Sequence, residues 1–296
     1  MENIIECINL THYYGKRLIY KDLNFFVPQG RILGLLGKNG TGKTTTINIL
    51  SGYLKPYSGK CLIFNQEANS ILPETRKKIG LLIEGHVQYQ FMNISQIEKF
   101  YSQFFPGQWR KDAYYSLMEK LKVAPNQKIN KMSNGQRSQV ALGLILAQNP
   151  ELLVLDDFSL GLDPGYRRLF VEYLRDYAKS ENKTVFLTSH IIQDMEQLID
   201  DCIIMDYGKI LVQMPVNDLL GKIKKYRCYI PEKQYVSESI DGLFHPEKNK
   251  VLLEFFSFKG EQEVIELLKK EGIEFTNLQS YSVGLEDAFI GLTGKY

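Results

Sequence analysis

The chain has 296 residues, of which 44% are hydrophobic, enough for one large domain or two modest ones with a buried core. Its formal net charge of +2 excludes a global field that would attract nucleic acid or an acidic membrane surface. Four scattered cysteines without a CxxC pair argue against a disulfide framework or a cysteine zinc site, and are typical of a reduced, cytoplasmic protein.

The first segments of the chain predict strands. The opening "MENIIECINL" lacks the basic start and long apolar core of a signal peptide. "IIECINL" and "LIYKDLNFFV" are strand-like, and "PQG" makes a turn after the second. "RILGLLG", at 31–37, predicts a buried strand, followed by a glycine-rich loop and a helix from about Thr44 to Leu54.

The middle of the chain alternates helix and strand. Residues 74–125 are mostly helical in pattern and rich in aromatic residues. The segments that follow are a helix at 134–148, the strand "ELLVLD", a helix at 166–180, the strand "TVFLTSH" and two strands within "DCIIMDYGKILVQ". Such alternation predicts an α/β fold with a largely parallel sheet. The longest apolar stretch, 140–147, is far shorter than the ~20 residues that cross a bilayer.

The sequence changes character after a short helix in "MPVNDLLGKIKKY". We therefore divide the chain into a first domain at 1–220 and a small α/β accessory domain at 221–296. The accessory part predicts a strand near 251–256, a helix near 261–271 and a final segment containing "GLEDAFIGLTG".

"GKNGTGKTT" fits the G-x-x-x-x-G-K-[ST] phosphate loop between a predicted strand and a predicted helix. Its glycines allow backbone N–H groups to point at phosphate oxygens, and the helix start favours the same anion. Lys43 is expected to contact the β- and γ-phosphates, and the Thr44 hydroxyl to bind Mg²⁺. A glycine-rich turn with a chance lysine is the alternative. The expected contact residues are Gly37, Lys38, Asn39, Gly40, Thr41, Gly42, Lys43, Thr44 and Thr45.

A second anion site is predicted where Ser133 caps the helix that follows it and Asn134-Gly135 exposes backbone donors. This site has no lysine of its own. Two incomplete phosphate sites in one chain suggest two chains, each completing the site of the other.

These motifs together resemble the ABC-type ATPases over roughly residues 3–215. "MSNGQR", containing Ser133, Gly135 and Gln136, resembles the LSGGQ signature. Other matches, in chain order, are Tyr14 with the adenine-stacking A-loop residue, Asp156 with the end of the Walker B strand, Asp163 with the D-loop and His190 with the switch histidine. Tyr13 could take the place of Tyr14, and a histidine after a strand is more often structural.

The resemblance implies a P-loop NTPase core with an antiparallel β subdomain and a helical subdomain at about 85–148, with the C-terminal α/β part as an addition. It also implies ATP as substrate, Mg²⁺ as cofactor and Lys43, Asp157 and His190 as catalytic residues. Thr44, Asp156 and Glu84 are the implied metal contacts.

Three positions depart from the family pattern. Asn134 replaces the first glycine of the signature, although asparagine tolerates left-handed backbone. Glu84 stands where the family usually has the Q-loop glutamine; it either meets Mg²⁺ or its water, or is a solvated loop residue. Neighbouring side chains of a strand point to opposite sides, so Asp156 and Asp157 should differ in role.

Asp157 stands where the family places its catalytic glutamate and is one methylene shorter. A displacement of ~1 Å can cost ~10²-fold in rate, which predicts slow hydrolysis. The opposing interpretation is a subunit that binds ATP to close a dimer and barely hydrolyses it.

The resemblance implies a second ATPase subunit, identical or different, and a separate transmembrane permease on whose cytoplasmic face the protein works; nucleic acid is not expected. The aromatic stretch 86–109 would contact the permease or simply pack within the helical subdomain. "LEDAFIGLTG" resembles the ending of bacterial drug-, peptide- and lantibiotic-export ATPases, and bacitracin-type exporters also carry glutamate at the position of Glu84. Export of a drug, antimicrobial peptide or lipid-like substrate is therefore favoured. A soluble ABC ATPase without a permease is the alternative, whereas a P-loop kinase or GTPase would have no use for the signature.

Overall fold

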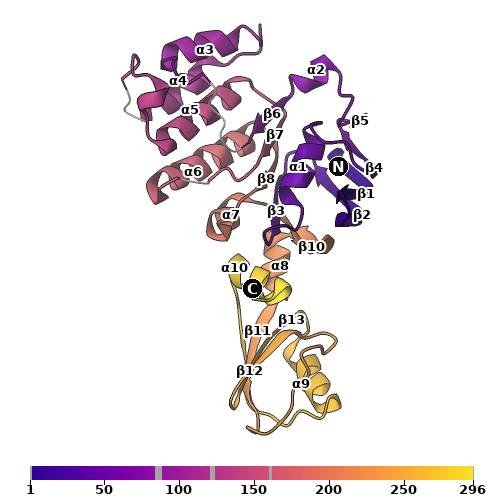
Figure 1. Cartoon of the computed structure of the whole chain (residues 1–296). Helices are drawn as coiled ribbons and strands as arrows, with labels where there is room; N and C mark the ends of the chain where they lie inside the picture. Colours follow the sequence, from indigo (N-terminus) through magenta and orange to yellow (C-terminus); the bar gives the residue numbers. More distant parts are fainter. Residues whose placement is uncertain (1, 84–88, 121–123, 160–161, 296) are drawn as a thin grey trace.

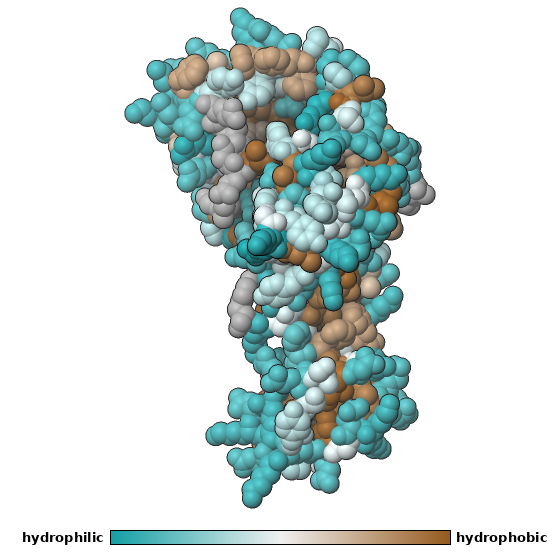
Figure 2. Space-filling model, turned by 45° about the vertical axis from the view of Figure 1, so that its right-hand side comes forward, coloured by the Kyte–Doolittle hydropathy of each residue, from teal (hydrophilic) through white to brown (hydrophobic). Residues whose placement is uncertain are grey.

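The computed structural model describes residues 2–83, 89–120, 124–159 and 162–295. A large unit of two sheets and helices continues into a smaller C-terminal unit, and helix α10 at the chain's end lies between them (Figure 1). Figure 2 shows a narrow waist where the two units meet. Within the described residues, no helix combines the length and apolar composition needed to cross a membrane.

The central sheet has six strands in the order β10-β9-β3-β8-β7-β6, parallel except for β10. Its members are β3 (Ile32–Gly37), β6 (Ile79–Leu82), β7 (Leu152–Leu155), β8 (Thr184–Thr188), β9 (Asp201–Asp206) and β10 (Lys209–Pro215). The apolar runs of β3, β7, β8 and β9 are buried on both faces of the sheet, as the sequence predicts for a parallel sheet.

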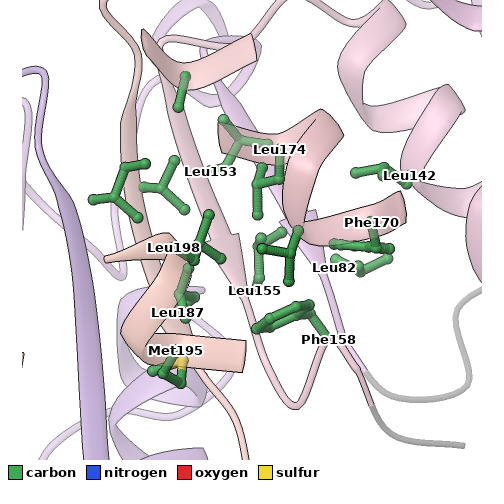
Figure 3. Packing of buried hydrophobic residues seen from close by; sticks show 14 of the residues in the cluster. Leu82, Leu142, Leu153, Leu155, Phe158, Phe170, Leu174, Leu187, Met195 and Leu198 are labelled. Atoms are coloured by element: carbon green, nitrogen blue, oxygen red, sulfur yellow. The ribbon is translucent and has the colours of Figure 1, made fainter. Parts of the chain in front are cut away.

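Strand β7 divides its side chains between two hydrophobic clusters. Leu153 and Leu155 pack with residues of β6, β8 and the helices α5, α6 and α7 (Figure 3). Leu152 and Val154 face the other cluster, which also contains residues of β1, β2 and α1. This alternation places helices on one side of the sheet and the antiparallel strands on the other.

An antiparallel sheet covers that second side, in the order β2-β1-β4-β5. Its strands are β1 (Asn3–Tyr14), β2 (Arg17–Pro28), β4 (Ser58–Ile63) and β5 (Gln66–Glu67). Helix α1 (Lys43–Leu50) packs between the two sheets. It ends before the predicted Leu54, because the chain turns at Gly52, which adopts a left-handed φ of 74°.

Apart from α1, the helices of the large unit follow the antiparallel strands in the sequence. They are α2 (Pro73–Arg76), α3 (Ile94–Ser102), α4 (Lys111–Lys120), α5 (Asn134–Ala147), α6 (Pro164–Ser180), α7 (Ile192–Leu198) and α8 (Val216–Lys222). The prediction that 74–125 is mostly helical is wrong at β6, which pairs in parallel with β7. A four-residue segment with three apolar side chains is too short for sequence periodicity to separate a strand from a helix, and here strand pairing decides.

The C-terminal unit is an antiparallel sheet in the order β12-β13-β11-β14, with its own hydrophobic cluster. Its elements are β11 (Lys224–Tyr229), β12 (Phe244–Asn249), β13 (Leu252–Ser257), α9 (Glu261–Lys270) and β14 (Thr276–Tyr281). The last helix, α10 (Leu285–Thr293), leaves this sheet and returns to the large unit. There Leu285, Phe289 and Leu292 join the main hydrophobic cluster, and α10 contacts α7, α8 and β9.

Gly291 allows α10 to approach the C-terminal sheet. A Cβ at this position would lie 2.4 Å from Cγ of Phe256 on β13, whereas a Cβ at Gly221 in α8 would meet nothing within 4 Å. We expect Gly291→Ala to lower the melting temperature, because overpacking of about 1–3 kcal/mol outweighs the gain in helix propensity. Gly221→Ala is the control and should leave it unchanged or slightly raised. Equal melting temperatures of the two variants, measured by differential scanning fluorimetry, would contradict the tight contact.

Candidate nucleotide site

The phosphate loop joins β3 to α1 and depends on its glycines. Gly40 and Gly42 have φ of 80° and 107°, a left-handed region that strains other residues. A Cβ on Gly42 would also lie 2.8 Å from the ring of Tyr20. Gly37 is needed for space, because a Cβ there would lie 2.5 Å from Thr41 Oγ1. The backbone therefore curls as the motif predicts.

Lys43 starts α1 and is buried, with 6% of its surface exposed. Its ammonium donates hydrogen bonds to the carbonyl oxygens of Gly37, at 2.7 Å, and Lys38, at 3.1 Å. Burial lowers the pKa of Lys43, while the carboxylates of Asp157 and Asp156 act in the opposite direction. The ammonium thus lies inside the loop and close to both aspartates.

A cleft with a volume of about 270 Å³ opens beside this loop. The predicted residues that line it are Tyr14, Asn39, Gly40, Gly42, Lys43, Thr44, Thr45 and His190. Gly37, Lys38 and Thr41 are not among its lining residues, and the Thr41 hydroxyl donates to the Lys38 carbonyl at 2.8 Å. The structure therefore brings the first loop, the aromatic residue and the histidine to one place.

Tyr14, not Tyr13, lines the cleft. Its ring is half exposed and meets His12 edge-on, with the ring centroids 5.0 Å apart. Tyr13 packs against Tyr57 instead, at 5.1 Å between centroids. His12 is buried, which lowers the pKa of its imidazole and favours the neutral form of the ring beside Tyr14.

Arg17 and Ile19 also line the cleft but were not predicted from the sequence. A Cβ on Gly40 would lie 3.3 Å from the Arg17 guanidinium, so this cation reaches the phosphate loop. The sequence signal was its position, three residues after Tyr14. Spacing alone cannot show that the turn between β1 and β2 brings Arg17 to a loop far along the chain.

The two aspartates follow β7, at a point where the chain turns out of the strand. The strand ends at Leu155, not at Asp156, so the predicted alternation of strand side chains does not apply to them. Asp157 instead adopts a left-handed φ of 45°. The Thr188 hydroxyl connects the pair: it donates to Asp156 Oδ1 at 2.7 Å and accepts from the Asp157 backbone N–H at 3.0 Å.

His190 contacts Asp157 directly. The distance from Nε2 of the imidazole to Oδ2 of the carboxylate is 2.9 Å, and the imidazole is 43% exposed, on the side of the cleft. Asp156 is buried, with 7% of its surface exposed. One carboxylate is thus held within the protein, and the other is paired with a group that faces the cleft.

The signature segment caps α5 and does not line this cleft. The Ser133 hydroxyl accepts from the Gln136 backbone N–H at 3.2 Å, and the Gln136 side chain accepts from the Ser133 N–H at 3.0 Å. Gly135 lies against Tyr166, where a Cβ would be 2.7 Å from the ring. Asn134 belongs to the first turn of the right-handed helix and does not use left-handed backbone. Glu84 lies outside the described residues.

Comparisons with known proteins identify related sequences. The profile of the family described as ABC transporter matches residues 20–159. The bacitracin transport ATP-binding protein BcrA of Bacillus licheniformis is 30% identical over 99% of this chain and 98% of that protein. The Nod factor export ATP-binding protein I of Rhizobium sp. (strain N33) is 27% identical over 98% of this chain and 97% of its own length. The linearmycin resistance ATP-binding protein LnrL of Bacillus subtilis is 26% identical, with 99% of each chain covered.

Solved structures share the fold. An ATP-binding subunit of an ABC transporter superposes with a TM-score of 0.64 and 23% identity, covering 73% of this chain and 91% of that one. A dimeric ATP-binding cassette in a post-hydrolysis state, bound to ADP and Pi, gives a TM-score of 0.61 and 21% identity, covering 71% of this chain and 98% of that one.

The contrast between the two tyrosines can be tested. We expect Tyr14→Ala to weaken nucleotide binding about 5- to 150-fold, because base–aromatic stacking contributes about 1–3 kcal/mol. Tyr13→Ala removes a similar ring outside the cleft and should leave the Kd for ATP within twofold. Titration with a fluorescent ATP analogue measures both. A larger loss of affinity for Tyr13→Ala than for Tyr14→Ala would show that Tyr13, not Tyr14, stacks on the base.

Proposed function

The chain belongs to the ABC transporter family of ATP-binding proteins and is an ATP-hydrolysing subunit, and we propose that it drives export through a separate membrane permease. In this proposal two ATPase subunits, identical or different, sandwich ATP head to tail at the cytoplasmic face of the membrane. The soluble alternative without a permease is not favoured, because the relatives include proteins named for transport and export.

The proposed dimer rests on one observation: the two predicted phosphate sites of the chain lie in different places. Lys43, Thr44 and His190 share one cleft, whereas Ser133 and Gly135 lie at the start of α5 and do not line it. A helix start attracts an anion, but this one does not line the cleft that holds Lys43; the cation beside it is Arg137, which donates to Asn134 Oδ1 at 2.6 Å. A second copy that presents this helix start to the cleft would complete the site.

The residues of the cleft suit phosphoryl transfer, in which positioning and electrostatics supply most of the catalysis. The Lys43 ammonium exchanges its loop carbonyls for phosphate oxygens, and Tyr14 stacks on the base. Thr44 lines the cleft, and the Asp156 carboxylate is near the Lys43 ammonium. A hydroxyl and a carboxylate are hard oxygen ligands of the kind that Mg²⁺ prefers, so this donor set fits the ion. Bound there, Mg²⁺ would neutralise developing phosphate charge.

Asp157 is the proposed base that orients the attacking water. Its contact with His190 supports a shared role, since a group that holds the carboxylate also faces the cleft. The side chain is shorter than the usual glutamate, and we propose slow but real hydrolysis. His190 would sense the γ-phosphate by exchanging its contact with Asp157 for one with phosphate oxygen.

The substrate class comes from the relatives. Their names refer to bacitracin transport, Nod factor export and linearmycin resistance, and each aligns over nearly the whole chain, including the C-terminal unit. The solved cassettes cover less than three quarters of it. We therefore propose export of a drug, antimicrobial peptide or lipid-like molecule.

The proposed permease contact is an aromatic cluster of α3 and the residues on either side of it. Neighbouring rings of this cluster have centroids 4.8 to 6.4 Å apart. Two of the five rings, Phe91 and Phe104, are 64% and 57% exposed. The cluster consists of Tyr89, Phe91, Phe100, Tyr101 and Phe104. Exposed apolar side chains gathered in this way mark interaction surfaces.

The catalytic role of Asp157 has a direct test. We expect Asp157→Asn to reduce ATP turnover about 10²–10⁴-fold, because a positioned base contributes that much, while the Kd for ATP stays within a fewfold. Asp176→Asn, an exposed carboxylate of α6, is the matched control and should turn over normally. Phosphate release and ATP binding are measured in parallel. Unchanged turnover in Asp157→Asn would exclude Asp157 as the base.

The sandwich dimer has its own test. In the Asp157→Asn background, Mg²⁺ and ATP should convert the chain to a dimer in light scattering, and Ser133→Ala should shift this transition to higher protein concentration. Asn93→Ala removes the equivalent capping box of α3 and should dimerise normally. Each substitution costs a helix cap of about 0.5–2 kcal/mol, so a general loss of stability would affect both variants equally. A strictly monomeric ATP-bound chain, alone and with a permease, would refute the sandwich.

A further inference from the structure

Helix α10 connects two parts of the nucleotide site that are distant in sequence. Its first turn is held by α7, where Glu196 Oε2 accepts from the Leu285 N–H at 2.8 Å and Gln193 donates to Glu286 at 2.6 Å. Helix α7 begins at Ile192, two residues after His190. The start of α10 is therefore fixed to the helix that follows the histidine.

The other end of α10 is held by the phosphate loop. Lys38, the residue after Gly37, donates from Nζ to the carbonyl oxygen of Thr293 at 2.6 Å and to that of Lys295 at 3.5 Å. Only 6% of Lys38 is exposed. The last carbonyls of a helix have no partners within it and carry partial negative charge, so a buried ammonium is well placed there.

Lys38 also holds the inside of the loop through its backbone. Its carbonyl oxygen accepts from the Lys43 ammonium at 3.1 Å and from the Thr41 hydroxyl at 2.8 Å. One residue therefore joins α10 to the group expected to bind phosphate. A shift of α10 must move the Lys38 backbone, break the buried hydrogen bond or leave the helix carbonyls unsatisfied.

We propose that Lys38 is a positioning residue: by binding the carboxyl end of α10 it fixes the phosphate loop in its binding shape. Nucleotide affinity then depends on the docking of α10. The inference rests on the proposed function, since it takes this loop to be the nucleotide site. Glu196 is the corresponding anchor at the other end, on the side of His190.

The coupling extends to the C-terminal unit. Phe256 of β13 lies against Gly291 of α10, and Lys295 forms an ion pair with Glu247 of β12. If nucleotide binding favours the docked position of α10, then docking of α10 must, by linkage, strengthen nucleotide binding by the same factor. The C-terminal sheet can thus influence the phosphate loop through α10 without touching the nucleotide.

The first experiment measures the Kd for Mg²⁺–ADP by calorimetry on the full chain, because ADP binds without hydrolysis or the second subunit. We expect Lys38→Met to weaken binding about 5- to 50-fold, within the usual range of coupling between sites, and Lys38→Arg to keep it within about threefold. Lys270→Met is the control: it removes an exposed lysine side chain of α9, which belongs neither to the phosphate loop nor to α10, and should bind normally.

A second measurement separates coupling from a merely structural role. Saturating ADP should slow hydrogen exchange of the amides at 285–293 in the wild-type chain, and Lys38→Met should abolish this response. Glu196→Ala, which lies outside the loop, should also weaken ADP binding and covers the case in which Lys38→Met does not fold. A wild-type chain that binds no ADP would contradict the proposed nucleotide site. The coupling would be refuted, and the nucleotide site would stand, if the wild-type chain bound ADP normally and one of two results followed. Either both variants bind ADP within twofold of the wild-type chain, or ADP does not change hydrogen exchange in 285–293.

Discussion

The side-by-side arrangement of three parallel strands, β3, β8 and β7, is the constraint on which the nucleotide site depends. Leu35 pairs with Thr188, and Leu155 with Leu187, so these strands end at the same edge of the sheet. The phosphate loop follows β3, the two aspartates follow β7 and His190 follows β8. Segments more than a hundred residues apart therefore meet without any direct sequence signal for their contact.

Charge balance within this edge determines what the residues can do. A buried ammonium costs free energy unless partners surround it, and Lys43 has loop carbonyls as well as two nearby carboxylates. The Thr188 hydroxyl fixes both aspartates by donating to one and accepting from the backbone of the other. This network holds both acidic residues near the cation.

The C-terminal part is a separate sheet whose last helix belongs to the core of the large unit. A boundary drawn near residue 220 from composition captures the sheet but assigns α10 to the accessory part. The apolar face of α10 is equally compatible with either unit when only the sequence is considered. Its position results from packing against α7 and α8, and from the hydrogen bond that Lys38 donates.

The sequence by itself determined the α/β alternation, the phosphate loop and the order of the motifs, because glycine placement, helix capping and strand patterning are local properties. Most predicted elements lie where expected, and Tyr14, Lys43 and His190 share one cleft. Only the tertiary structure decided the strand nature of β6, the pairing of His190 with Asp157, the approach of Arg17 to Gly40 and the return of α10. Each of these depends on which distant segments become neighbours, and that follows from strand order and core packing, not from the spacing of residues along the chain.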